Sequence, residues 1–435
     1  MKGPISKRGL APLSYTSPAE IFFRGNGVGH ITFIKAESSS SIMKIIRAWK
    51  YRIYPSKKQE NELNGYLFDC KNLWNFLLEH TKKSYEETGK FPTRKELYLL
   101  SKEANVYSQV AQNVADKLAK SLKGMIAKKK ADKKAGFPRF KSFERMRSFT
   151  YPQFGFKLNE KLELSDIGNI AIKKHREMHG EIKTLTLKKS PSEKWFAIFT
   201  TESEVVIPEK KHGAEIGIDL GIENFGYLSN GSKIENPRHL EKAEELLIRA
   251  HRELSRKKKG SNNRRKARLK VTKAHEDLTN TRRDFLHKIS KKLVDSYSLI
   301  AVENLNVSGL ARGFLAKHVL DCSWAEFLSM LHYKAEEAGC EVVLVDPAHT
   351  SQRCSSCGLV QKKTLAERWH ECSCGVSMHR DLNAAKNILA RVTSGTGGYQ
   401  ACEETTSTHY KHNEQVSSMK QEAHTIDRRN GQCAP

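Results

Sequence analysis

Three acidic residues stand at positions where a protein can hold a divalent metal ion. Asp219 and Glu303 each close an apolar run that predicts a strand, and Asp381 falls in the first turn of a predicted helix. The carboxyl ends of strands in an open α/β sheet converge on one crevice, so we expect the three carboxylates to meet there. They would repel each other unless Mg²⁺ or Mn²⁺, which prefer hard oxygen ligands, neutralised them. Two such ions can activate a water for phosphodiester cleavage.

The same residues also fit less specific roles. Each acid alone is more often a helix cap or a solvated strand end. The stretch Ile216–Gly221 also resembles the first phosphate motif of actin-like ATPases and sugar kinases, but those proteins place small hydroxyl residues next, whereas Ile222-Glu223-Asn224 follows here. A kinase would not explain a net charge of +26 either. The three acids in this order within one domain therefore favour a nuclease-type metal site.

A second candidate site is a cluster of four among the nine cysteines, namely Cys354, Cys357, Cys372 and Cys374. They form two short turns, each followed by a glycine that lets backbone amides approach the thiolates. Four sulfurs at this spacing satisfy tetrahedral Zn²⁺ and leave no position open for water, so we expect a structural site. His370 and His379 lie nearby and are weaker candidates for a ligand.

The composition indicates a polyanionic partner. The chain has 75 Lys and Arg against 49 Asp and Glu, and each phosphate contact would release condensed counterions. Basic runs at Lys257–Lys259 and Arg264–Lys266 favour phosphate contacts over a merely solvated helix face. The stretch Gly136–Lys141 mixes aromatic and basic residues, which suits base stacking. No long apolar run or signal peptide is found, so we expect a cytoplasmic protein without a membrane partner.

The hydrophobic pattern changes along the chain. A strand from Met43 is followed by helices and then by short alternating strands up to Thr201, which fits a β-barrel with a helical insertion. Beyond Gly213, buried strands alternate with long helices, as in α/β domains. The polar residues before Met43 and the Ser- and Gly-rich tail are expected to have no fold of their own. Capping boxes are expected to start two helices, at Ser56 with Gln59 and at Thr93 with Glu96.

These features together resemble the TnpB family, transposon-encoded nucleases also labelled OrfB transposases and related to type V CRISPR effectors. The resemblance implies that Asp219, Glu303 and Asp381 are catalytic acids that bind Mg²⁺ or Mn²⁺, and that the four clustered cysteines bind Zn²⁺. One departure is His379, where many members have Asp. The matching stretches are Met43–Pro55, Gly136–Lys141, Ile216–Gly221, Val302–Leu305, Thr350–Cys354 and Arg380–Ile388.

The resemblance also implies a multidomain α+β fold. It consists of an N-terminal wedge-type β-barrel with an inserted helical recognition lobe, then a ribonuclease H-like (RuvC) α/β domain with a small zinc-ribbon insertion. The expected parts are an unstructured extension (1–42), the barrel (43–55 and 136–205), the helical lobe (56–135), the nuclease (213–349 and 376–391), the zinc-binding insertion (350–375) and a disordered tail (392–435).

Family members bind an RNA derived from the transposon end and use it to find DNA beside a short motif. We therefore expect an RNA-guided, divalent-metal-dependent DNA endonuclease of a mobile element, with guide RNA and double-stranded target DNA as partners, in bacterial or archaeal cytoplasm near the nucleoid. One alternative is a cleavage-deficient guided repressor, although such drift should damage an acid and none is damaged. Another is an unguided RuvC-like nuclease or transposase.

Overall fold

A computed structural model of the 435-residue chain describes residues 34–36, 42–206, 208–313, 315–364 and 367–393. The chain divides into two compact units, Met1–Val206 and Ile207–Pro435. The predicted disordered tail begins at residue 392, but Val392 and Thr393 belong to the helix α9 (Arg380–Thr393), so the prediction is wrong for these two residues. The rest of that tail and most of the predicted N-terminal extension lie outside the described residues. Within those residues, no helix has the length and apolar character needed to cross a membrane.

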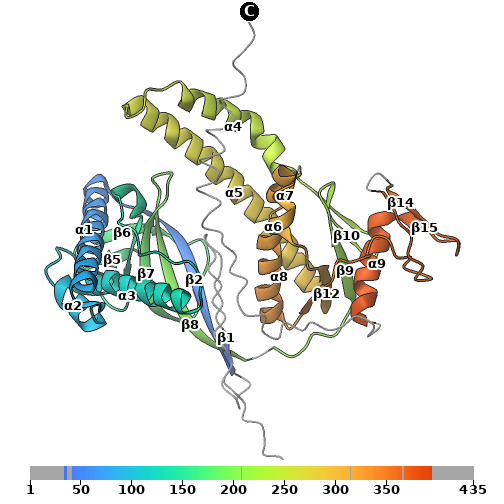
Figure 1. Ribbon diagram of the computed structural model, residues 1–435, viewed down its shortest axis with the longest axis horizontal. Helices are drawn as coiled ribbons and strands as arrows, with labels where there is room; N and C mark the ends of the chain where they lie inside the picture. Colours follow the sequence, from blue (N-terminus) through green and yellow to red (C-terminus); the bar gives the residue numbers. More distant parts are fainter. Residues whose placement is uncertain (1–33, 37–41, 207, 314, 365–366, 394–435) are drawn as a thin grey trace, which may run out of the picture. The chain divides into compact units, whose positions relative to one another are not determined.

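The first unit is built on an eight-stranded antiparallel sheet with the order β3-β7-β8-β2-β6-β5-β4, and β1 also pairs with β2 (Figure 1). The rings of Tyr151 on β3 and Phe156 on β4 lie edge to face with centroids 6.2 Å apart, so the two ends of the sheet approach each other. The sheet is thus nearly closed, as a barrel requires. Its strands are β1 (Ile34–Ala36), β2 (Ile42–Tyr54), β3 (Ser148–Tyr151), β4 (Phe156–Leu158), β5 (Leu162–Leu164), β6 (Gly168–Lys173), β7 (Glu181–Lys189) and β8 (Trp195–Val206).

Three helices cover this sheet: α1 (Lys57–Thr88), α2 (Arg94–Ser101) and α3 (Ser108–Lys130). The predictions of both capping boxes are confirmed, because Ser56 and Thr93 each accept from the third helical amide and receive the reciprocal side-chain bond. Buried residues of α1 and α3 belong to the same hydrophobic core as those of the sheet. A short turn of 3₁₀ helix, η1 (Phe143–Arg145), lies between α3 and β3.

Strand β1 corrects one sequence prediction. It lies inside the range 1–42, which was expected to be unstructured, and pairs in the register Ile34↔Ile45 and Ala36↔Met43. On one edge of β2, the strand β8 pairs with nearly the whole length of β2. On the opposite edge, β6 pairs only with the last three residues of β2. The rest of that edge offers unpaired backbone groups, and the preceding chain turns back to pair with them. The prediction is wrong for these three residues and for Ile42, which begins β2.

The second unit contains a mixed five-stranded sheet with the order β11-β10-β9-β12-β13. The pairs β9–β10 and β10–β11 are antiparallel, whereas β12 runs parallel to both β9 and β13. The strands predicted to end at Asp219 and Glu303 are confirmed. The strands are β9 (Glu215–Leu220), β10 (Asn224–Leu228), β11 (Lys233–Glu235), β12 (Leu299–Glu303) and β13 (Glu341–Val345).

Helices lie on both faces of this sheet. Residues of α5 and α8 share a core with Ile218 and Val302, whereas Ile388 and Val392 of α9 pack with Ala301 and Val345. Figure 1 shows α8 and α9 on opposite sides of β9 and β12. The helices are α4 (His239–Ser255), α5 (Asn262–Ser296), α6 (Val307–Leu310), α7 (Ala316–Cys322), α8 (Trp324–Ala338) and α9 (Arg380–Thr393), and a small hairpin of β14 (Trp369–Glu371) and β15 (Ser377–His379) precedes α9.

Gly217 lets α9 lie directly against β9. A Cβ atom at this position would overlap the carbonyl oxygen of Ala385 and would lie 2.8 Å from the backbone nitrogen of Leu389. Both obstacles belong to the helix backbone, which cannot move aside as the end of a flexible side chain can. The missing side chain therefore sets the distance between the helix that carries Asp381 and the strand that carries Asp219.

We expect Gly217→Ala to destabilise the second unit by about 3 kcal/mol, because an added carbon in a packed contact forces the backbone apart. Gly124→Ala is the matched control: this glycine lies in α3, and its added Cβ would meet nothing within 4 Å. The control should leave stability unchanged or raise it by up to about 1 kcal/mol, the difference in helix propensity. Thermal unfolding of both variants measures this, and equal melting of Gly217→Ala and wild type would contradict the packing argument.

Candidate functional site

The alternation of side chains along β9 and β12 directs two acids to the same face of the sheet. Gly217 faces α9, and Ala301 packs with α9 in one hydrophobic cluster. Asp219 and Glu303 lie two residues further along their strands, and side chains two residues apart share a face. The two strands are parallel and in register at Ala301↔Gly217, so both carboxylates emerge at the same end. Asp381 lies in the first turn of α9 on that face.

The pKa of Asp219 responds to both of the other acids. Burial raises its pKa well above the ordinary value, and the negative charges of Glu303 and Asp381 raise it further, while Arg380 acts in the opposite direction. An acid that gains no compensating cation in such surroundings favours the protonated form. The structure thus brings together the three acids that the sequence singled out.

Glu303 is buried and held by a hydroxyl group. Burial raises its pKa, and the hydrogen bond from Thr350 opposes that rise. Thr350 Oγ1 donates to Glu303 Oε1 at 2.5 Å. Thr350 belongs to one of the stretches that resemble the family, but its sequence context predicted no role for it. A threonine placed long after Glu303 in the chain carries no local signal that would have revealed this contact.

Asp381 is surrounded by groups that orient it. Its backbone amide donates to His379 Nδ1 at 3.3 Å, and Arg380 Nε lies 3.5 Å from its carboxylate. The His379 ring stacks on Tyr227 of β10, with centroids 4.7 Å apart and an angle of 13° between the planes. His379, the position that departs from the family pattern, therefore packs beside the acid instead of contributing a further carboxylate.

The four cysteines are gathered more tightly than the acids. Their sulfur atoms all lie within 4.8 Å of one another, the only such set of three or more candidate metal ligands within the ranges that the structure describes. Cys354 and Cys374 sulfurs are 3.7 Å apart, and those of Cys357 and Cys372 are 3.5 Å apart. Sulfurs bound to one Zn²⁺ at about 2.3 Å in a tetrahedron are about 3.8 Å apart, so these residues fit zinc.

Each cysteine pair lies in a turn closed by a glycine. The amides of Gly358 and Gly375 donate to the carbonyls of Cys354 and Cys372, both at 3.0 Å. The two glycines have φ angles of +78° and +88°, which other residues rarely adopt. In the second turn, the backbone amide of Cys374 lowers the pKa of Cys372 to about 6. Such turns favour the thiolate form that a metal requires.

Two asparagines of α9 connect the cysteine turns to the acids. Asn383 Nδ2 donates to the carbonyl of Arg353 at 2.7 Å, and its Oδ1 accepts from the amide of Ser355 at 2.8 Å. Asn387 Nδ2 donates to the carbonyl of Thr350 at 2.9 Å. The segment 350–355 therefore contacts Glu303 through Thr350 and contains the start of the first cysteine turn. Hydrogen bonds from the two asparagines hold this segment against α9, the helix that carries Asp381. Sequence reasoning assigned no role to either asparagine.

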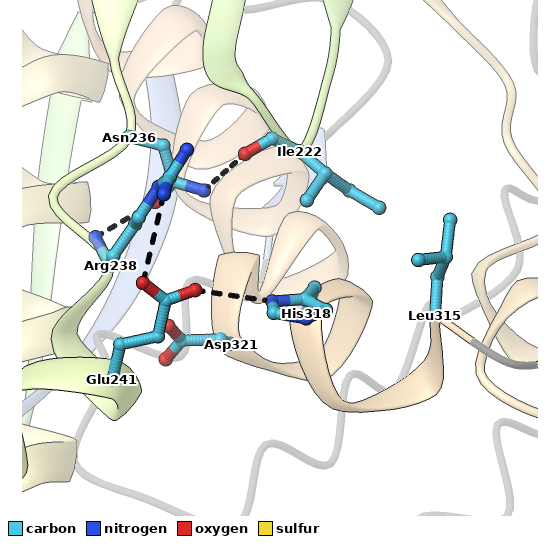
Figure 2. A pocket seen from close by; sticks show the side chains of 7 residues that line it. All are labelled: Ile222, Asn236, Arg238, Glu241, Leu315, His318 and Asp321. Atoms are coloured by element: carbon cyan, nitrogen blue, oxygen red, sulfur yellow. Dashed lines mark hydrogen bonds and ion pairs between the residues drawn. The ribbon is translucent and has the colours of Figure 1, made fainter. Parts of the chain in front are cut away.

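A separate cavity of about 200 Å³ lies beside α4 and α7 and includes none of the three acids. Figure 2 shows Glu241 between two basic groups, with Arg238 Nη1 at 3.7 Å and His318 Nδ1 at 3.5 Å. Asn236 accepts from the backbone amide of Arg238 at 3.0 Å, and its Nδ2 donates to the carbonyl of Ile222 at 2.6 Å. The charged groups in this cavity compensate one another, so the acid cluster is the stronger candidate for catalysis.

Family models match three parts of the chain. A model described as "Probable transposase" (OrfB) matches residues 198–313, one described as "Cas12f1-like, TNB domain" matches residues 324–388, and one described as "Helix-turn-helix domain" matches residues 43–90. The last description does not agree with the fold. Residues 43–90 here form β2 and the single long helix α1 instead of two helices joined by a turn.

Curated relatives match most of the chain. It is 32% identical over 374 residues to "Putative RNA-guided DNA endonuclease InsQ" of Escherichia coli (strain K12), covering 80% of this chain and 92% of the relative. It is 34% identical over 365 residues to "Putative RNA-guided DNA endonuclease" of Streptomyces pristinaespiralis, covering 80% and 90%. The chain therefore belongs to the OrfB family of transposon-encoded proteins, also called TnpB, and the resemblance inferred from its motifs is confirmed.

Solved structures are more distant. "Cryo-EM structure of the Cas12f1-sgRNA-target DNA complex" aligns with a TM-score of 0.49 and 13% identity, covering 79% of this chain and 98% of that one. "Structure of the mini-RNA-guided endonuclease CRISPR-Cas_phi3" aligns with a TM-score of 0.43 and 11% identity, covering 80% and 92%. The family assignment rests on the sequence relatives and not on these alignments.

Metal analysis should find about one zinc per chain in protein purified without chelator, because four thiolates satisfy the ion completely. Cys354→Ser should lower the zinc content and the melting temperature, since structural zinc contributes folding free energy. Cys340→Ser is the matched control, because Cys340 is buried outside the cluster, and it should keep its zinc. A zinc-free wild type with fully titratable thiols would refute the site.

Asp219→Asn should raise the melting temperature of the metal-free protein by several degrees at neutral pH. Folding raises the pKa of Asp219, so its favourable contribution is complete below the unfolded-state pKa of about 3.9 and is lost as pH rises through the folded-state value. The gain should therefore vanish in acid, and added Mg²⁺ should stabilise only the wild type. Asp277→Asn, at an exposed position on α5, is the control, and a pH-independent effect of Asp219→Asn would contradict this account.

Proposed function

We propose that this chain is an RNA-guided, divalent-metal-dependent DNA endonuclease of a mobile element, with Asp219, Glu303 and Asp381 as its catalytic acids. The observation that carries the proposal is the convergence of these three carboxylates on one face of the sheet, from β9, β12 and α9. The pKa of Asp219 is raised by burial and by the charges of Glu303 and Asp381. A helix cap or a solvated strand end needs no second acid beside it, so neither role explains why these three acids lie together.

The three acids would hold Mg²⁺ or Mn²⁺, whose chemistry is to activate a water and stabilise the leaving oxygen. The chain's own groups prepare this site. Thr350 holds the Glu303 carboxylate in place, and Arg380 and His379 orient Asp381. Burial raises the pKa of Asp219 and of Glu303, so a bound cation would favour their anionic forms and couple metal binding to proton release.

The guided mode of action is supported by the relatives. The proteins of Escherichia coli and Streptomyces pristinaespiralis are named as RNA-guided DNA endonucleases, and the matches span 92% and 90% of their lengths. The net charge of +26 suits a chain that holds RNA and double-stranded DNA together. In such a protein, base pairing reads the target sequence and the protein reads only a short duplex motif.

We assign the expected domains on the same basis. Three antiparallel strands extended by two parallel ones, with α9 on one face, support a ribonuclease H-like (RuvC) domain at 213–349 and 376–391. The cysteine turns between β13 and α9 support a zinc-ribbon insertion at 350–375. The nearly closed sheet supports a wedge-type barrel at 43–55 and 136–205, and α1–α3 support a recognition lobe at 56–135. The host setting we propose is bacterial or archaeal cytoplasm.

The full chain with its copurified RNA should cut a plasmid only when the variable end of that RNA matches the plasmid. The test changes the RNA end and the plasmid target independently, because an unguided nuclease would follow neither change. Cutting should stop in EDTA or after ribonuclease treatment before assembly.

Asp219→Ala, Glu303→Ala and Asp381→Ala should each abolish cutting and leave RNA binding intact, whereas Asp277→Ala should cut normally. Cutting that survives in the Asp219→Ala protein would refute the catalytic assignment. If cutting follows neither the RNA change nor the plasmid change, the chain is an unguided nuclease. If the wild-type protein binds the matching plasmid but does not cut it, the chain is a guided repressor.

A further inference from the structure

Four phenylalanine side chains of the first unit are exposed to solvent. Phe68, Phe76, Phe140 and Phe143 have exposed fractions of 45 to 48%. Phe68 and Phe76 lie on α1, and the other two lie on the segment that follows α3. Single exposed apolar residues are ordinary, but a cluster of rings on one surface usually marks the place where a partner binds.

The segment 139–143 is fastened across α1 by paired hydrogen bonds. Asn75 Oδ1 accepts from the backbone amide of Lys141 at 2.8 Å, and Asn75 Nδ2 donates to the carbonyl of the same residue at 2.9 Å. The Lys141 ammonium lies 3.4 Å from the centroid of the Trp74 ring. The Phe143 ring meets that of Phe68 edge to face, with centroids 6.2 Å apart. These contacts fix the positions of Phe140 and Phe143 against α1.

Lysine side chains accompany two of these rings. Lys71 Nζ lies 4.4 Å from the centroid of Phe68, and Lys82 Nζ lies 4.6 Å from that of Phe140. A cation over a ring is attracted to the ring's negative face. Exposed rings interleaved with cations are the composition that binds single-stranded nucleic acid, since bases stack on the rings while the cations contact phosphates.

We propose that Phe68, Phe140 and Phe143, with Lys71 and Lys82, form a stacking surface for unpaired bases of the guide RNA; below, these five residues are called the aromatic patch. The inference rests on the proposed function and adds the place where part of the RNA binds. RNA is the occupant because stacking on exposed rings requires unpaired bases. Under the proposed function the guide is the single-stranded partner, whereas the target is double-stranded DNA.

The test measures binding of a short fluorescent oligoadenylate RNA to the full chain, stripped of copurified nucleic acid, over a range of salt concentrations. The triple variant Phe68→Ala, Phe140→Ala, Phe143→Ala should weaken binding about tenfold or more, because each stacked base contributes measurably. Its salt dependence should stay as in the wild type, because no phosphate contact is lost. Lys71→Ala with Lys82→Ala should instead reduce the logarithmic salt slope by about 1.4, or about 0.7 for each charge.

Phe154→Ala is the matched control. Phe154 is 64% exposed and lies outside the aromatic patch, between β3 and β4, so this variant should bind like the wild type. A conservative triple variant with tyrosine at the three positions should restore binding, which a merely structural defect would not allow. Unchanged thermal unfolding of the alanine variant confirms that folding is intact.

Binding of the alanine variant at the strength of Phe154→Ala would overturn the proposal. A loss of affinity for oligodeoxyadenylate but not for oligoadenylate RNA would also overturn it and would assign the aromatic patch to DNA. So would an alanine variant whose only change is the salt dependence of binding. These outcomes differ from a failure of the proposed function itself. That failure would appear as a wild-type chain that neither retains a defined RNA nor cuts matching DNA.

Discussion

The contact between α9 and β9 is the one on which the candidate site depends. Gly217 has no side chain, so the helix backbone rests directly on the strand. The next side chain on that face of β9 is Asp219, and the first turn of α9 carries Asp381. Two carboxylates from distant parts of the second unit's sequence therefore meet because one small residue permits two backbones to touch. The parallel pairing of β9 with β12 then adds Glu303.

Two candidate ion sites of opposite character are connected to that same helix. The cysteine turns use backbone amides to favour thiolates, as the lowered pKa of Cys372 shows, and so they are ready for a soft cation. The acids have the reverse character, because burial and mutual repulsion raise the pKa of Asp219. A zinc ion held by the cysteines would stabilise the local fold, whereas a divalent cation at the acids would relieve the unfavourable electrostatic energy of their burial. Asn383 and Asn387 join the two, so disorder in the cysteine turns would reach Thr350 and Glu303.

In the first unit, one set of apolar side chains forms the core and another set is exposed. Its core is continuous from the sheet through α1 and α3, which leaves the outer side of α1 free to bind a partner. The exposed rings gathered there contribute little to that core. They gain their fixed positions from Asn75 and Trp74, residues whose side chains hold the backbone that follows α3.

Local signals in the sequence determined much of this protein. Capping boxes at Ser56 and Thr93, the alternation along β7 and the spacing of the cysteine pairs depend on residues a few positions apart, so they could be read directly. The convergence of strand ends in an α/β sheet predicted the grouping of the acids, and the family resemblance implied their catalytic role. Only the tertiary structure decided that Thr350 bonds Glu303, that Asn383 and Asn387 fasten the cysteine turns, and that β1 pairs with an open edge of β2. The side-chain contacts join residues distant in the chain, and they form because packed backbones bring unpaired polar groups together. The residues of β1 and β2 are close in the chain, but their pairing depends on the edge of β2 that β6 leaves open. No local pattern records either condition.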